Sequence, residues 1–168
     1  VASAKDATAQ FYNPAAMTDL KGKQLSLGGT WLSTYTSFAG VAPYPGNGVT
    51  EKMKSGSFFP PTFYWTNRLS RRVAYGVGVN APYGLGVEWE NPTTFTGRDR
   101  VTKAKLQSID GSFNLAVALS PSVSIAGGVN ARYAKVELNN IGTFITAGGA
   151  PVNIFNAQLS SRDRKSVV

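Results

Sequence analysis

Apolar and polar residues alternate with a period of two along most of this chain. Between Val73 and Trp89 all nine odd-numbered positions are apolar or aromatic, whereas the even-numbered positions include four glycines together with Asn80, Pro82 and Glu88. Successive side chains of a β-strand point to opposite faces, so this alternation predicts a strand with one apolar face. The same pattern predicts five strands, over residues 24–37, 57–67, 72–89, 104–119 and 123–137.

The connections between these segments are short and long in turn. Residues 67–71 and 120–122 are short turns, whereas residues 38–56 and 90–103 are long, polar and punctuated by glycine and proline. An up-and-down meander with all its tight turns at one end is typical of bacterial outer-membrane barrels. The sequence therefore predicts an all-β fold, an antiparallel partial transmembrane barrel of about five strands, with residues 139–162 as the start of a third external loop.

The alternative is a soluble β-barrel or sandwich that turns its apolar face inward and binds a small hydrophobic ligand. Predicted strands of 16–18 residues exceed the 3–10 that are usual in globular sheets. Aromatic residues lie near the ends of the apolar rows, as an interfacial girdle requires. The other face carries Gly, Ser, Asn and Thr with the charges of Glu88, Asp110 and Arg132. Such a face is a poor dry core but a suitable wet lumen, so the membrane barrel is favoured.

The amino-acid composition excludes several kinds of functional site. The 168 residues include no cysteine and no histidine, which excludes disulfides, thiolate zinc sites and catalysis by a Cys or Ser–His nucleophile. The sequence has no nucleotide, metal or triad motif, so we expect a protein that is not an enzyme and needs no cofactor or metal. The formal net charge is +8. Its basic residues favour lipopolysaccharide phosphates over nucleic acid, because they lie at one tight turn (Arg68, Arg71 and Arg72) and in or beside the long loops (Lys52, Lys54, Arg98, Arg100, Lys103 and Lys105).

Two short motifs resemble a known family. Asn13-Pro14-Ala15 lies just before the first predicted strand, and the third contains Val79-Asn80-Ala81-Pro82-Tyr83-Gly84-Leu85. Both resemble the long-chain fatty-acid outer-membrane transporter (FadL-like) family. The resemblance implies a barrel of about fourteen strands, plugged by an N-terminal hatch and located in the bacterial outer membrane. It implies passive uptake of long-chain fatty acids or of aromatic or aliphatic hydrocarbons, with lateral exit at a kink in the third strand. Residues 1–22 would be the end of the hatch and residues 23–138 five barrel strands.

Local chemistry supports a kink in the third strand. Pro82 has no N–H to donate to a sheet, and Gly84 and Gly86 can adopt bulge geometries, so this segment predicts a break in strand pairing. We assign the lateral opening to Ala81, Pro82, Tyr83, Gly84 and Leu85. A bend that only shapes the barrel is the alternative.

The remaining candidate residues follow from the same picture. We expect the corner formed by Asn13, Pro14 and Ala15 to pack inside the barrel against the kink. Arg132 and Asn130 are candidates to meet a carboxylate head group, although pairing of Arg132 with Glu88 or Asp110 is the favoured role. Aromatic residues that are candidates to line an apolar substrate path, with ordinary packing as the alternative, are Phe11, Tyr12, Phe58 and Tyr64.

The last residues, 163–168, differ in character from the preceding segment. Their reverse translation resembles the start of a common sequencing adapter. We therefore expect a non-native tail and exclude these residues from the fold prediction.

Overall fold

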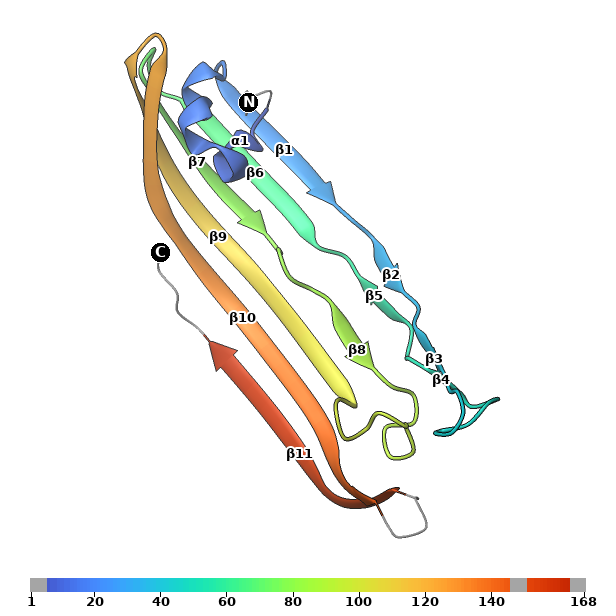
Figure 1. The fold of residues 1–168 in the computed structure, drawn as a ribbon. Helices are drawn as coiled ribbons and strands as arrows, with labels where there is room; N and C mark the ends of the chain where they lie inside the picture. Colours follow the sequence, from blue (N-terminus) through green and yellow to red (C-terminus); the bar gives the residue numbers. More distant parts are fainter. Residues whose placement is uncertain (1–5, 146–150, 164–168) are drawn as a thin grey trace.

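The computed structural model describes residues 6–145 and 151–163 as an open antiparallel sheet with a short helical segment on one face (Figure 1). The helical segment consists of α1 (Ala9–Tyr12) and the 3-10 helix η1 (Pro14–Asp19). The strands are β1 (Lys23–Gly29), β2 (Leu32–Thr34), β3 (Ser37–Ala39), β4 (Thr50–Lys52), β5 (Gly56–Phe58), β6 (Pro61–Arg68), β7 (Val73–Asn80), β8 (Gly86–Glu88), β9 (Lys103–Ser120), β10 (Val123–Ile145) and β11 (Pro151–Asp163). Within the described ranges no helix is long and apolar enough to span a membrane.

The strands form one wall. The main sheet has the order β1-β6-β7-β9-β10-β11, and β8 also pairs with β9. The pairs β2–β5 and β3–β4 form two small sheets. Because β1–β6 and β2–β5 share one register, with Gly29 opposite Pro61 and Leu32 opposite Phe58, β2 and β5 continue the lines of β1 and β6. The predicted all-β antiparallel meander is confirmed, and the sheet is open.

The prediction of a third external loop at residues 139–162 was wrong over the residues that the structure describes. Strand β10 continues to Ile145, and β11 pairs with it, which adds a strand line to the five predicted. A register shift between Gly142 and Thr143 leaves Ile154 without an aligned partner. The apolar positions of β11 change parity at this bulge, which hides the alternation. Asp163, assigned to the tail, pairs with Ala134, and residues 164–168 lie outside the described residues.

The two faces of the wall differ in what covers them. The helical segment, which we call the hatch, packs on one face and forms a core of Ala9, Met17, Leu20, Ala74 and Ala116. The opposite face is apolar and uncovered. Its half-exposed or exposed side chains include Leu25, Leu27, Phe63, Val79, Phe113, Leu115, Ile125 and Val129. The apolar face is therefore not the sealed core of a soluble barrel, because so large an exposed surface requires an apolar partner.

Candidate functional site

The hatch is fixed to β7 and β9 by close contacts and polar bonds. A Cβ atom on Gly76 would lie 2.7 Å from Gln10 Oε1 and 2.8 Å from Met17 Sδ, so the missing side chain lets the hatch approach the strand. Gln10 Nε2 donates to Ser112 Oγ at 3.2 Å, and Asn114 Nδ2 donates to the backbone oxygen of Gln10 at 3.0 Å. Sequence reasoning missed these contacts, although a glycine on the hatch side of a strand is a signal for close approach.

The third predicted strand is interrupted, as Pro82 and its neighbouring glycines predicted. Strand β7 ends at Asn80 and β8 begins at Gly86. Residues 81–85 stay attached to β9, since the Ser108 N–H donates to the Tyr83 oxygen at 2.8 Å and the Leu106 N–H donates to the Leu85 oxygen at 3.0 Å. The break therefore interrupts strand pairing only on the opposite edge, which faces β6 and β5.

On that other side the wall has a slit. Pairing between β6 and β7 ends at Thr62 and Asn80, and among the described residues no backbone hydrogen bond joins 55–60 to 81–87. Backbone contact resumes where the Lys54 N–H donates to the Glu88 oxygen at 2.8 Å. We call the unbonded stretch between residues 55–60 and 81–87 the wall slit.

The ring of Phe58 lies in the wall slit against Gly84. A Cβ atom on Gly84 would overlap this ring, so the ring occupies the place of the absent side chain. A cavity of about 250 Å³ lies at the slit. Its lining includes Leu32 and Phe58, which follow the hatch side of their strands, and Lys103 and Lys105 from the opposite face. Residues from both faces of the wall therefore meet in one cavity.

A second cavity of about 390 Å³ lies beside the slit and is mainly apolar. Leu85, Val87, Leu106 and Val136 line it together with Met53. Leu106 and Val136 are opposite each other in the sheet and alternate onto the same side as Asp110 and Arg132, which is the hatch side. The hatch side of the wall is thus apolar near the long loops, whereas farther toward the hatch it carries the charged residues Asp110 and Arg132.

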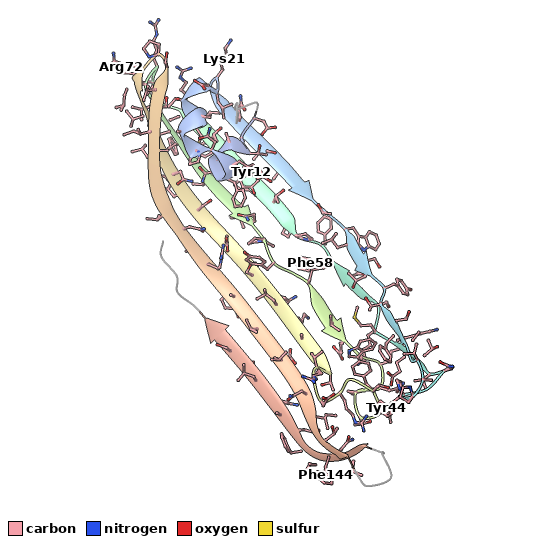
Figure 2. The ribbon with its side chains drawn as sticks, in the orientation of Figure 1. Tyr12, Lys21, Tyr44, Phe58, Arg72 and Phe144 are labelled. Carbon is pink, nitrogen blue, oxygen red and sulfur yellow. The ribbon has the colours of Figure 1, made fainter. Side chains whose placement is uncertain are left out.

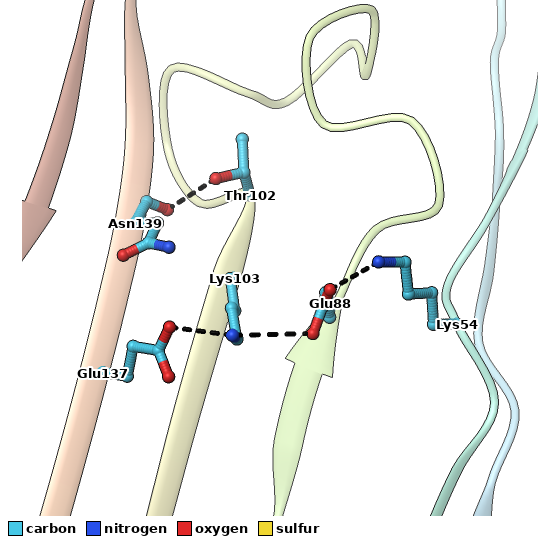
Figure 3. A network of polar contacts seen from close by, with 6 residues as sticks. All are labelled: Lys54, Glu88, Thr102, Lys103, Glu137 and Asn139. Carbon is cyan, nitrogen blue, oxygen red and sulfur yellow. Dashed lines mark hydrogen bonds and ion pairs between the residues drawn. The ribbon is translucent and has the colours of Figure 1, made fainter.

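A row of charged side chains closes the loop end of the slit (Figure 3). Lys54 Nζ lies 2.5 Å from Glu88 Oε1. Lys103 Nζ lies 3.7 Å from Glu88 Oε2 and 2.7 Å from Glu137 Oε1. The row therefore connects the segment after β4 with β8, β9 and β10.

The prediction that Glu88 faces the lumen was wrong. Asn80 is opposite Asp110 and Gly86 is opposite Lys105, so six steps along one strand match five along the other. One extra residue in the break exchanges the two faces of the following strand. Glu88 consequently lies on the side of Lys103, which is the face of the uncovered apolar residues of β9 and is opposite the hatch.

Arg132 pairs with Asp110 and not with Glu88. Its Nε and Nη2 donate to the two carboxylate oxygens at 2.7 and 2.6 Å, and Asp110 is only 1% exposed. The guanidinium group also lies 5.5 Å from the centre of the Tyr83 ring, within cation–π range. This arrangement holds Tyr83 of the break against β10 and leaves Arg132 with its charge already balanced.

The candidate path residues fall into two places. Phe11 contacts Tyr12 and Tyr64 with ring-centre distances of 5.0 and 6.0 Å, at the surface of the hatch. Figure 2 shows Phe58 farther along the wall, toward the loop end where Tyr44 lies. The hatch corner of Asn13, Pro14 and Ala15 is the junction of α1 and η1. Its packing against the kink stays a prediction.

Comparison with known proteins places the chain in a family. Residues 1–167 match the family model described as "Outer membrane protein transport protein (OMPP1/FadL/TodX)". The chain belongs to this family. Two curated relatives are outer membrane protein P1 of Haemophilus influenzae. The one from strain ATCC 51907 / DSM 11121 / KW20 / Rd is 24% identical over 193 residues, and the other is 26% identical over 197 residues. Each alignment covers 99% of this chain and 42% of the relative.

A solved structure supports the same fold. The crystal structure of a Pseudomonas aeruginosa FadL homologue superimposes with a TM-score of 0.66 at 18% identity, covering 94% of this chain and 42% of that chain. The chain thus spans less than half the length of the relatives that it matches. This OMPP1/FadL/TodX-family chain is an outer-membrane protein, and its wall is part of a FadL-like barrel.

Proposed function

We propose that the complete barrel containing this chain takes up hydrophobic compounds passively across the outer membrane and releases them sideways through the wall slit. The family is one of outer-membrane transport proteins. The observation that carries the proposal is the slit itself, where the strands are not hydrogen-bonded and the Phe58 ring lies against Gly84. A wall that has lost its pairing at one place can open there without disturbing the rest of the sheet.

The path through the wall follows the apolar groups. Long-chain fatty acids or aromatic or aliphatic hydrocarbons would pass the aromatic group of Phe11, Tyr12 and Tyr64 and enter the apolar cavity beside Leu85. Rotation of the Phe58 ring would connect that cavity with the lipid. Each buried CH₂ group stabilises an apolar ligand by about 0.8 kcal/mol in either environment, so transfer from cavity to lipid needs no energy input.

The hatch is proposed as the gate. The corner of Asn13, Pro14 and Ala15 connects α1, which carries Phe11 and Tyr12, with η1, which carries the buried Met17. A ligand that displaces Phe11 or Tyr12 would move this corner relative to the strand break. Arg132 offers little attraction to a ligand carboxylate, because Asp110 already binds it through two hydrogen bonds.

The experiment is to bridge the slit covalently in the complete protein. This chain has no cysteine, so Phe58→Cys and Gly84→Cys are the only cysteines within it and lie on the two edges of the slit. A short reducible dithiol crosslinker between them should stop uptake of a labelled long-chain fatty acid or alkylbenzene, and reduction should restore it. A matched control joins Phe63→Cys to Val79→Cys, which are opposite each other in the paired part of the wall.

The outcomes separate lateral exit from a simple bend. Loss of uptake only with the slit crosslink supports the proposal. Normal uptake with the slit crosslinked would show that the break only shapes the barrel, and that ligands leave by another route.

A further inference from the structure

A band of lysines lies on the uncovered face of the wall, at the boundary of its apolar surface. On β9 the apolar residues of this face run from Ile109 to Leu119, and Tyr133 of β10 is opposite Ile109. Ten residue steps span about 33 Å along a strand, or about 25 Å of height at the tilt of about 40° usual in outer-membrane barrels, which matches their apolar band of about 25 Å. Ile109 and Tyr133 therefore lie near the edge of the hydrocarbon layer.

Basic side chains follow on the same face. Lys135 follows Tyr133 by two residues, or about 7 Å, and on β9 Lys105 and Lys103 follow beyond Gln107, which is opposite Lys135. The polar layer of a bilayer begins at this height, and lysine side chains extend toward it from the edge of the apolar region. The long connections lie at this end of the strands, which is the external end in such barrels. The facing leaflet is therefore the outer one.

The charges in this band do not cancel. Lys54, Lys103, Lys105 and Lys135 face Glu88 and Glu137, which leaves a net charge of +2. Lys54 and Lys103 are paired with the glutamates, whereas among the described side chains neither Lys105 nor Lys135 forms an ion pair. Both of these lysines are exposed. The free positive groups thus lie where lipid phosphates would be.

We propose that Lys105 and Lys135, supported by Lys103, bind the phosphate groups of lipopolysaccharide beside the wall slit. Lysine binds phosphate as a point charge and suits a headgroup without fixed geometry. Lys105 also lines the cavity at the slit, so the bound lipid would form part of the rim of the opening. The sequence analysis placed Lys103 and Lys105 in or beside a long loop, whereas in the structure both belong to β9 and lie on its outer face.

The test compares lipopolysaccharide binding by the complete protein and by Lys105→Gln/Lys135→Gln, using native mass spectrometry in detergent with added lipopolysaccharide. We expect about 30-fold weaker binding for the double variant, from two surface lysines. A matched control, Lys21→Gln/Lys23→Gln, removes the same charge at the opposite end of the wall, where Figure 2 places Lys21, and should bind like the wild type. Heat-dependent gel migration checks that each variant is folded.

A variant with the opposite expected effect separates binding from structure. Glu137→Gln frees Lys103 from its 2.7 Å partner and should strengthen lipopolysaccharide binding about fivefold. Equal binding by the wild type and the double lysine variant would overturn the proposal. Equal binding of lipopolysaccharide and phosphatidylglycerol would also overturn it, because the surface would then recognise any anionic lipid.

Discussion

The hatch half and the loop half of this wall differ in how the strand that contains the break meets its neighbours. In the hatch half β7 pairs with β6 from Arg68–Ala74 to Thr62–Asn80 and with β9 along its whole length. In the loop half β8 and residues 81–85 keep their bonds to β9, whereas β5 lies across the wall slit. One edge of the strand is therefore a continuous support, and the other edge is released at one place.

This difference makes the hatch half of the wall stiff and confines opening to the loop half. Each backbone hydrogen bond contributes about 1 kcal/mol net, so the paired hatch half resists separation, while the slit depends on one aromatic ring and one row of ions. Regions with few buried contacts and few backbone bonds open at lower free energy. The two halves of the wall should consequently respond very differently to substitution.

The largest expected effect removes the anchor of the hatch half. Met17 is fully buried between the hatch and the wall. We expect Met17→Ala to lower the free energy of unfolding by about 3 kcal/mol, because truncation of a buried methionine leaves a cavity. Urea unfolding of the complete protein and protease cleavage of the hatch measure this effect. Met17→Leu, which keeps the volume, should cost less than about 1.5 kcal/mol, and equal losses in both variants would contradict the assignment.

An intermediate effect is expected at the supported edge of the break. Asp110→Asn removes the charge that accepts two hydrogen bonds from Arg132, and we expect a loss of about 2 kcal/mol, as for hydrogen bonds to charged groups. Faster hydrogen exchange at the Ser108 amide, which is bonded to Tyr83, would accompany it. If Asp110→Asn causes the same loss of stability in a protein that also carries Arg132→Met, the Asp110–Arg132 pair is not the cause of that loss.

The smallest effect is expected at the released edge. Lys54 and Glu88 have side chains 54% and 41% exposed, so their ion pair is screened by water. We expect Lys54→Gln to cost less than about 1 kcal/mol, and high salt should produce a similar change in the wild type. A loss above about 2 kcal/mol would show that the loop half is as firmly closed as the hatch half, and the contrast between the halves would fail.

Sequence patterns predicted the fold better than they predicted which residues meet. Alternation in Val73–Trp89 and at β9 and β10 reports one apolar face, so the strands and the meander followed from it, and the break followed from Pro82, Gly84 and Gly86. Alternation does not report which residues meet, so the contact of Phe58 with Gly84 and the packing of Met17 against Gly76 were not predicted. Bulges were missed for the same reason, because an extra residue changes the parity of every later position.

The extra residue within 81–85 makes the length of that segment a constraint of its own. Removing one residue from 81–85 would exchange the two faces of β8. The Glu88 carboxylate would then enter the apolar cavity, and the Val87 methyl groups would meet the lipid headgroups. An unpaired carboxylate in such surroundings is strongly disfavoured. Related chains should therefore vary more freely in the identity of these five residues than in their number.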